Sequence, residues 1–476
     1  MTDVVLALDI SSSGVRARAH DRDLRVVAER ALDLDTRVAA DGTSGHDLDE
    51  VLTAVRAVLR PLAADPRLRP VALAASGTAS SLVAMEPGEQ ARSEVLLWSD
   101  TRAAGHYPEL AEALAEAYPR TLCPPDVSYW PAKLRYLAER GLRADGRLAG
   151  IKDVVFAWLT GALWTDPMTA ASSGVFDSAA WRWDTALLSR LGVPSARLPE
   201  VRGATDSAPL RAGVAAELGL PAGLPVAAGG MDGPLSQLGA AGTREQVASC
   251  TVGTSVAVRA ASGTRVGDPR QRTWCYPVTE RLWVTGGAGS NGGNLLTWLR
   301  DRVGMGGSIP ELADAAFGVP ADPELLFVPY LNGERAPWWR SELRAAFLGL
   351  AAHHGSADLA RAVLDGLAAA VQDLAAAVQS VAGRPGQVVF TGGFLQDKRW
   401  VQLMTDALGL PAAAPDPDCA TSVGVAMLGW AVAEQAGLDE VFTPALRPVA
   451  EPDPAEHRRL RTVSGRIAEC RRLLWP

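Results

Sequence analysis

The sequence predicts an α/β protein built from two domains. Short apolar runs alternate with amphipathic segments along the chain, as is typical of strands and helices that follow one another. The chain has 476 residues, more than a single hydrophobic core normally organises. A strand–turn–strand pattern at residues 5–19 occurs again at residues 248–260. We interpret this as a faint internal duplication and expect domains at residues 1–243 and 244–476.

The composition excludes several classes of protein. The net charge of −8 argues against a general nucleic-acid binder, which needs a basic face. The five cysteines are scattered without a CxxC spacing, so neither a zinc site nor a disulfide framework is expected, and a reducing compartment is favoured. The N-terminus lacks a signal pattern and no run of eighteen apolar residues occurs, which predicts a cytoplasmic protein that does not engage a membrane. The oligomeric state stays open, with a homodimer as one possibility.

The first turn of the chain is suited to phosphate. Residues 4–8 are a continuous apolar run that predicts a buried strand, and Asp9-Ile-Ser-Ser-Ser-Gly14 follows it. Backbone N–H groups and hydroxyls in such a turn can surround phosphate oxygens. Asp9, at the tip of the strand, could hold Mg²⁺ directly or through water. A plain hairpin with a polar turn explains this stretch equally well.

A carboxylate follows a second predicted strand. Residues 224–228 are apolar and end in Gly229-Gly230-Met231-Asp232-Gly233. Glycines there let the backbone and a substrate approach closely, and a carboxylate at a strand end can accept a proton. An ordinary Gly-Asp turn is the alternative interpretation.

Two polar clusters in the first half suit a polyhydroxylated ligand. Small polar residues at 76–81 follow the predicted strand 71–75. Residues 98–102, Trp-Ser-Asp-Thr-Arg, combine a flat apolar surface, an acceptor and a fork of donors. A surface ion pair beside a core tryptophan is the alternative for the second cluster. With the aromatic stretch at 128–131, the candidate substrate-binding residues are Thr78, Ser80, Trp98, Asp100, Arg102 and Tyr129.

The second half carries glycine-rich segments at the ends of strands. Residues 286–294 are rich in glycine and precede a predicted helix at 295–303, which suits close approach of a nucleotide. The strand predicted at 387–390 ends in Thr391-Gly392-Gly393-Phe394, as a shelf for adenine and ribose requires. A simple strand-to-helix turn is the alternative. Further helices are predicted at 47–64, 106–119, 131–141, 152–159, 235–241, 356–382 (capped by Ser356 and closed by Gly383), 421–435 and 455–474.

Taken in order, these motifs resemble those of the FGGY carbohydrate kinases, the family of glycerol kinase, xylulokinase and gluconokinase. The resemblance rests on residues 9–16, 98–102, 165–166, 230–233, 253–255, 333–337 and 391–394, and covers nearly the whole chain. Residues 98–102 and 286–294 look most like gluconokinases. The resemblance implies two actin-like/ribonuclease H-like ATPase domains with a catalytic cleft between them, ATP and Mg²⁺ as cofactors, and a small sugar or sugar acid as substrate.

The resemblance also assigns roles to residues. Asp232 matches the general base that acts on the sugar hydroxyl, and Asp9 matches the acidic residue near Mg²⁺. The family pattern is altered where Ser11 and Ser12 replace Gly and Thr, where Ala79-Ser80 replaces Met-His, and at Cys419, where a Glu is common. The positions implied to bind ATP are Ser11, Ser12, Ser13, Arg16, Gly253, Thr254, Gly293, Thr297, Gly392, Gly393 and Gln396.

The reaction expected from these residues is transfer of the γ-phosphate of ATP to a hydroxyl. Arg102 is the candidate for holding a substrate carboxylate, because a guanidinium fork matches a carboxylate in two contacts. This favours gluconate as the acceptor. The alternatives are a ketose or polyol such as xylulose or glycerol, or a catalytically silent sugar-sensing relative.

Overall fold

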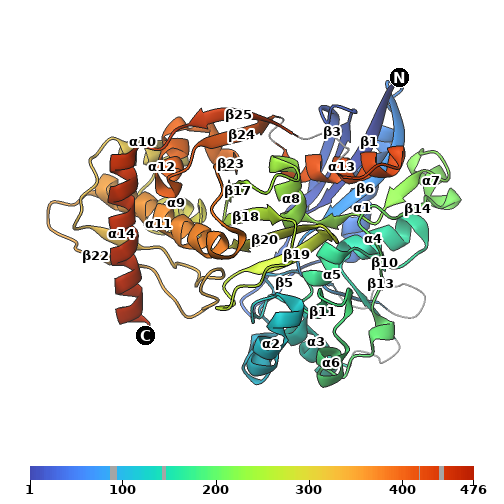
Figure 1. The fold of residues 1–476 in the computed structure, drawn as a ribbon, viewed down its shortest axis with the longest axis horizontal. Coiled ribbons are helices and arrows are strands. Elements are labelled where there is room, and N and C mark those ends of the chain that lie inside the picture. The colour runs from blue at the N-terminus through green and yellow to red at the C-terminus, as the bar shows by residue number, and fades with distance from the viewer. Residues whose placement is uncertain (86–93, 142–145, 417–418, 439–443) are drawn as a thin grey trace.

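A computed structural model describes residues 1–85, 94–141, 146–416, 419–438 and 444–476. It has two lobes, one formed mainly by the first half of the chain and one by the second (Figure 1). Each lobe contains a seven-stranded sheet covered by helices. The α/β fold class is therefore confirmed.

The sheet of the N-terminal lobe has the order β14-β15-β6-β1-β2-β3. Strands β1, β2 and β3 form an antiparallel meander, whereas β6 and then β15 join the other edge of β1 in parallel. The meander forms because the apolar strand β1 turns back at the serine-rich turn, with Asp9 opposite Arg16. The strands are β1 (Thr2–Ile10), β2 (Gly14–His20), β3 (Val26–Asp33), β6 (Leu68–Gly77), β14 (Ser207–Pro209), β15 (Pro225–Ala227) and, paired with β6, β16 (Gly230–Met231).

The sheet of the C-terminal lobe has the order β19-β20-β18-β17-β23-β24-β25. Strands β17, β18 and β20 are antiparallel neighbours, and β23 and β24 continue in parallel from β17. This repeats the arrangement of the first sheet, so the predicted duplication is confirmed as a repeated sheet topology. The strands are β17 (Val247–Val252), β18 (Val256–Ser262), β19 (Trp274–Thr279), β20 (Leu282–Ala288), β23 (Gln387–Thr391), β24 (Ala412–Asp416) and β25 (Ala445–Ala450).

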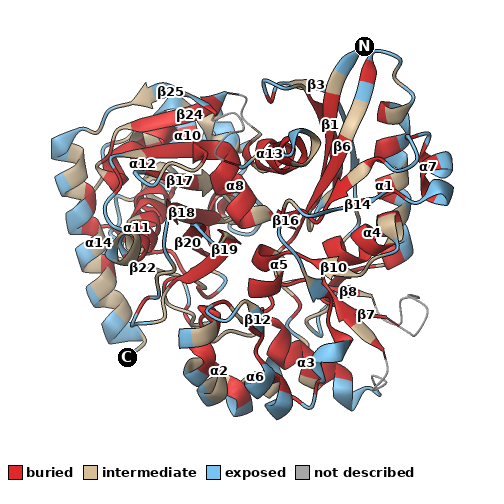
Figure 2. Cartoon of the chain, turned by 45° about the vertical axis from the view of Figure 1, so that its right-hand side comes forward, coloured by how far each residue is buried: buried red, intermediate tan, exposed pale blue. Residues whose placement is uncertain are grey.

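Helices α8 (Asp232–Ala241) and α13 (Ala420–Glu434) join the two lobes. Helix α13 packs on β1 and β6 of the N-terminal sheet, and α8 packs on β17 and β18 of the C-terminal sheet. The two helices also pack on each other between the sheets (Figure 2). A Cβ atom on Gly239 would lie 1.7 Å from the carbonyl oxygen of Ala420, so only glycine permits this approach.

Residues between β6 and β14 form an insertion below the N-terminal sheet (Figure 1). The rings of Trp130 and Trp183 stack on each other within it. Helix α4 returns the chain to the sheet, where it packs on β6. The elements are β7 (Val83–Met85), β8 (Val95–Leu96), α2 (Tyr107–Thr121), α3 (Trp130–Glu139), β9 (Arg147–Ala149), α4 (Ile151–Thr160), β10 (Trp164–Thr165), α5 (Pro167–Ala171), β11 (Phe176–Asp177), β12 (Arg182–Trp183), α6 (Thr185–Arg190) and β13 (Glu200–Val201).

The remaining helices pack on the outer faces of the sheets, as α1 and α11 do, or on helices that lie there, as α10 and α14 do. Helix α1 begins at Asp47, whose side chain accepts hydrogen bonds from Asp49 N and Glu50 N, and its apolar stripe packs on β2 and β3. These helices are α1 (Leu48–Ala63), α7 (Ala212–Leu218), α9 (Asn294–Asp301), α10 (Ile309–Phe317), α11 (Ser356–Ala382), α12 (Lys398–Leu408) and α14 (Pro454–Leu474). Short strands complete the chain at β4 (Arg37–Val38), β5 (Ser44–His46), β21 (Leu326–Val328) and β22 (Ala346–Leu348).

Helix α11 is the long helix expected at residues 356–382. Its capping residue is Gly355 rather than Ser356, because the carboxylate of Asp358 accepts the Gly355 N–H at 2.8 Å. The expected end at Gly383 is confirmed. Within the described residues, α11 is the one helix of sufficient length and hydropathy to cross a membrane, but 78% of its apolar window is buried inside the protein. It packs on β18 and β20 as a core helix.

Candidate active site

Three cavities adjoin one another, two of them lined by both lobes and the third by the C-terminal lobe alone. The inner cavity, of about 270 Å³, contains Asp232 and the middle cavity, of about 340 Å³, contains Asp9. Thr251 lines both of them. The outer cavity, of about 600 Å³, shares Gly393 and Gln396 with the middle cavity. The predicted phosphate turn, strand-end carboxylate and glycine shelf are thus brought together from distant parts of the chain.

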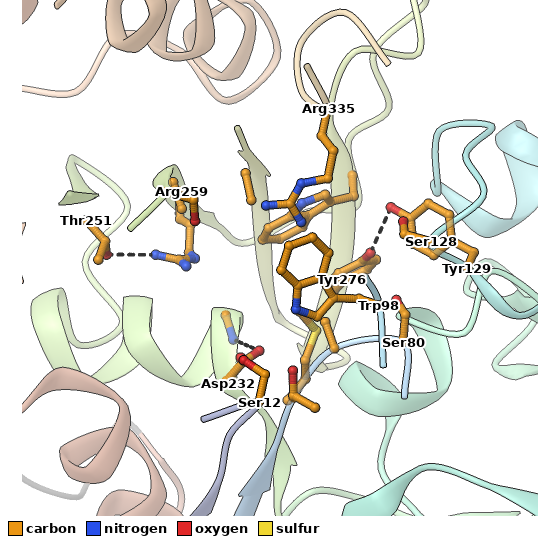
Figure 3. A pocket seen from close by; sticks show the side chains of 18 of the residues that line it. Ser12, Ser80, Trp98, Ser128, Tyr129, Asp232, Thr251, Arg259, Tyr276 and Arg335 are labelled. Atoms are coloured by element: carbon orange, nitrogen blue, oxygen red, sulfur yellow. Dashed lines mark hydrogen bonds between the residues drawn. The ribbon is translucent and has the colours of Figure 1, made fainter. Parts of the chain in front are cut away.

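Asp232 lies at the first residue of α8, at one end of the inner cavity (Figure 3). Its Oδ1 atom accepts a 2.7 Å hydrogen bond from the backbone N–H of Gly233. Burial and the nearby carboxylate of Asp9 raise the pKa of Asp232 to about 6, while the guanidinium groups of Arg259 and Arg335 oppose this shift. A carboxyl group with this pKa is ionised at neutral pH and is basic enough to accept a proton from a hydroxyl.

A buried lysine fixes the strand end that carries Asp232. The Nζ atom of Lys152 donates a 2.6 Å hydrogen bond to the carbonyl oxygen of Ala228. It also lies 2.8 Å from Asp153 Oδ1 and 3.1 Å from Asp166 Oδ2. All three charged side chains are buried, so the cluster anchors the backbone just before Gly229 by charge-assisted contacts.

The insertion supplies one wall of the inner cavity. Thr78, Ser80, Trp98 and Tyr129, which were predicted to bind substrate, all line the cavity. Ser80 has a positive φ of 53° and its hydroxyl donates a 2.6 Å hydrogen bond to Ser172 O. A non-glycine residue in this conformation is held there by its surroundings, as at many binding sites.

The C-terminal lobe supplies the opposite wall with two arginines. The guanidinium of Arg335 lies 4.1 Å from the ring centroid of Trp98 and donates a 2.8 Å hydrogen bond to Gly289 O (Figure 3). Arg259, on β18, donates a 3.1 Å hydrogen bond to the hydroxyl of Thr251. The Nε atoms of both arginines are buried without a hydrogen-bond partner in the described part of the chain. Both side chains therefore keep donors available to a ligand.

Asp100 and Arg102 do not line the inner cavity. The guanidinium of Arg102 forms two-pronged contacts with Asp100, of which the shortest is 2.6 Å, and reaches Glu94 Oε1 at 2.7 Å. Asp100 also accepts the backbone N–H of Ser44 at 3.1 Å. This ion-pair cluster braces the loop after β8, and Trp98 is the residue of the loop that reaches the ligand space.

The middle cavity brings together the oxygens that Mg²⁺ prefers. The carboxylate of Asp9 is half-buried, and its Oδ1 accepts a 2.6 Å hydrogen bond from Ser76 Oγ. Burial raises the pKa of Asp9. The other carboxylate oxygen of Asp9 and the hydroxyls of Thr251 and Thr391 suit a hard cation or its bound waters. The two hydroxyl oxygens lie 2.8 Å apart. Arg16 and Arg18 lie on the same wall, where positive charge suits phosphate.

The predicted ATP-binding residues divide among the three cavities. Arg16, Gly392, Gly393 and Gln396 line the middle cavity, while Gly253 and Gly293 line the outer cavity with Gly393 and Gln396. Ser11 and Ser12 lie on the wall of the inner cavity, and Ser12 lies close to Asp232 (Figure 3). Ser13 and Thr254 are exposed at the two turns, and the hydroxyl of Thr297 donates a 3.4 Å hydrogen bond to Gly293 O; these three residues line none of the cavities.

Three groups of the inner cavity were given no role from the sequence. Arg259 interrupts the apolar strand pattern of β18, which is a signal for a charged side chain facing a site. Arg335 belongs to the motif at residues 333–337. The stacked rings of Trp274 and Tyr276, 4.4 Å apart, complete the wall. No local pattern places these rings there, because both come from an edge strand of the second sheet.

Comparison with known proteins agrees with this geometry. The description "FGGY family of carbohydrate kinases" applies to models of an N-terminal domain, which matches residues 4–239, and a C-terminal domain, which matches residues 248–433. A gluconokinase from Bacillus subtilis is 26% identical over 90% of this chain and 87% of its own length. A glycerol kinase from Myxococcus xanthus is 28% identical over 94% of this chain and 96% of its own.

Solved structures share the fold over the whole chain. A gluconate kinase from Lactobacillus acidophilus superposes with a TM-score of 0.93 at 24% identity, covering 100% of this chain and 98% of that one. A xyloylose kinase from Brucella ovis gives a TM-score of 0.90 at 26% identity, covering 99% of both chains. The fold and the cavities between its lobes define a two-domain, actin-like ATP-dependent phosphotransferase. The chain belongs to the FGGY family of carbohydrate kinases, and it is an ATP-dependent sugar kinase.

Proposed function

We propose that this kinase transfers the γ-phosphate of ATP to a terminal hydroxyl of a small sugar acid, with Asp232 as the general base and gluconate as the favoured acceptor. The single observation that carries the assignment of the base is the half-buried carboxylate of Asp232 in the inner cavity, whose charge interacts with that of Asp9 in the middle cavity. The acceptor lies in the inner cavity and the nucleotide extends through the middle and outer cavities. We also propose the division of the domains at residues 243 and 244, a cytoplasmic location and a possible homodimer as they were predicted.

Within this proposal each cavity has its own task. Asp9 and the hydroxyls of Thr251 and Thr391 hold Mg²⁺, whose charge offsets that of the phosphates. Arg16, with Arg18, binds phosphate oxygens, and Gly392 and Gly393 allow the nucleotide to lie against the backbone. In the inner cavity, Asp232 takes the proton of the attacking hydroxyl, and such general-base help typically contributes about 10²–10⁴-fold.

The preference for an acid rests on positive charge in the inner cavity. Arg335 takes the role first considered for Arg102, because its guanidinium faces the cavity across Trp98 and retains an unused N–H. Arginine binds carboxylates with two parallel hydrogen bonds, and loss of one such contact to a charged group costs about 1.5–3 kcal/mol. The two gluconokinases among the similar proteins support the same choice.

The base is tested by Asp232→Asn. The variant should bind ATP and the acceptor with nearly unchanged affinity and lose at least about 10²-fold in kcat, because Asn cannot accept the proton. Coupled detection of ADP measures turnover, and calorimetry measures binding. Near-normal turnover in this variant would refute the role of Asp232.

The acceptor is tested by comparing gluconate, xylulose and glycerol at equal concentrations with the wild type and with Arg335→Met. Gluconate should give the highest kcat/KM, and the substitution should reduce this value for gluconate by about 10-fold or more while affecting the neutral acceptors less. If a neutral acceptor is preferred by the wild type, the acid assignment is wrong and a ketose or polyol kinase remains. If no acceptor yields ADP although one binds, the protein is a sugar sensor.

A further inference from the structure

Arg259 lines the inner cavity beside Thr251, the residue that this cavity shares with the middle one. Its β18 backbone belongs to the wall of the inner cavity, and its guanidinium lies between Thr251 and Asp232 (Figure 3). Thr251, which accepts its hydrogen bond, also lines the middle cavity. The side chain therefore stands at the boundary between the space of the acceptor and the space of the phosphates.

Contacts within the protein leave N–H donors of the Arg259 guanidinium unused. Among the described residues, Thr251 is the one partner to which it donates a hydrogen bond, and its Nε atom is buried with none. The charges of Arg259 and Asp232 interact, but the two side chains do not form a direct ion pair. Burial of the guanidinium lowers the pKa of Arg259, and the charge of Asp232 offsets only part of this effect. A half-buried cation with unused donors is suited to bind an oxyanion beside Asp232.

We infer that Arg259 is a catalytic residue that binds the transferring phosphoryl group and stabilises its charge as it passes from ATP to the acceptor. This inference rests on the proposed function. In the reaction the acceptor hydroxyl gives its proton to Asp232 while its oxygen forms a bond to the γ-phosphorus. The bond between that phosphorus and the bridging oxygen breaks, and its electron pair leaves with ADP. Arg259 faces the equatorial oxygens of the group in transit.

The position of Arg259 distinguishes this role from recognition of the acceptor. The group beside Asp232 must be the reacting hydroxyl, so an anion held at the same place is the phosphoryl group that this hydroxyl attacks. A carboxylate at the other end of the acceptor would reach Arg335, which lies over Trp98. Positive groups aimed at charge that develops in the transition state lower the barrier without tightening the binding of the ground state.

The test uses Arg259→Gln and Arg259→Lys, with the exposed Arg281→Gln as the matched control. At saturating gluconate and ATP, Arg259→Gln should lose about 10²–10³-fold in kcat, as when one preorganised donor to a developing charge is removed. Arg259→Lys should recover part of this loss, and Arg281→Gln should match the wild type. Calorimetry without nucleotide should give a dissociation constant for gluconate within about threefold of the wild type for all variants.

A second readout does not depend on turnover. In the presence of gluconate, ADP with aluminium fluoride mimics the phosphoryl group in transit, and Arg259→Gln should weaken its binding by at least about 10-fold while ADP alone binds normally. A kcat within threefold of the wild type would overturn the inference, as would a large loss of gluconate affinity at unchanged kcat, which would make Arg259 a carboxylate contact. These outcomes are read against a wild type that turns over gluconate. A wild type that phosphorylates no acceptor refutes the proposed function instead.

Discussion

The ammonium group of Lys133 donates a 3.0 Å hydrogen bond to the carbonyl oxygen of Ser80. Its second hydrogen bond, of 2.7 Å, goes to the carbonyl oxygen of Ser128. Both serines line the inner cavity, whereas Lys133 is fully buried behind them on α3. One side chain thus fixes two separate segments of the wall, including the strained backbone of Ser80.

Lys133→Met should therefore weaken binding of the acceptor more than it slows the chemical step. The substitution leaves two buried carbonyl oxygens without their donor, at a cost of about 1–3 kcal/mol each, and the wall relaxes. We expect the KM for gluconate to rise by about 10-fold or more, with kcat reduced less. The KM for ATP serves as the internal control, because Lys133 contacts none of the three cavities directly. A variant that folds and keeps its KM for gluconate would contradict this positioning role.

Lys152→Met should destabilise the N-terminal lobe and disturb Asp232. It removes the cation between Asp153 and Asp166, and breaking a buried ion pair in this way typically costs about 3–5 kcal/mol. Urea unfolding measures the loss. The triple variant with Asp153→Asn and Asp166→Asn should regain part of the stability, since no buried charge is left uncompensated. If the single and triple variants are equally unstable, the charge of Lys152 is not what holds the cluster.

Gly229→Ala should impair both folding and turnover. Gly229 has a φ of 83°, and a Cβ atom there would lie 2.2 Å from the carbonyl oxygen of Ala75, so the strand end that leads to Asp232 must shift. Gly223→Ala is the matched control, because its φ of 77° is similar but its Cβ would meet nothing within 4 Å. The control should lose only the roughly 1–2 kcal/mol of a left-handed alanine and keep full kcat. Equal effects on kcat in the two variants would contradict a requirement for close packing at Gly229.

Most of the longer helices and several strands could be predicted because their signals are local. Helix α1 follows its apolar stripe and its Asp47 cap, and α11 runs over the predicted residues. The order of strands could be expected only through the duplicated pattern and the family resemblance. Pairing of β1 with β6, for example, joins segments separated by the whole of α1, and no local periodicity encodes it.

The functional site was predictable where a residue follows directly from a strand end. Asp9 and Asp232 reach the cavities because the strands that carry them end there. Arg102 and Arg259 show the limit of this reasoning. The guanidinium of Arg102 is occupied by Asp100 and by Glu94, which approaches from outside the motif. The guanidinium of Arg259 reaches the cavity from the middle of a strand, where the direction of the side chain depends on the register of the sheet.

The pKa of Asp232 predicts a compromise between activity and stability. Burial and Asp9 raise this pKa from 3.8 to about 6. Between these two values the folded protein holds a proton that the unfolded chain has released, so the contribution of Asp232 to stability is complete below about pH 4 and is lost as the pH rises through 6. Since one pKa unit corresponds to about 1.4 kcal/mol, the loss is on the order of 3 kcal/mol. Turnover has the opposite dependence, because only the ionised carboxylate accepts a proton, and kcat/KM should fall tenfold per pH unit below about 6.

Asp232→Asn removes the charge and should therefore stabilise the inactive protein. At pH 7.5 its urea midpoint should exceed that of the wild type, whereas at pH 4 the two should coincide. The exposed Asp23→Asn variant should follow the wild type at both pH values, because it carries the same chemical change outside the cavity. If Asp232→Asn were less stable than the wild type at pH 7.5, the ionised carboxylate would be a stabilising group. The position beside Asp9 in the cavity would then not destabilise the ionised form of Asp232.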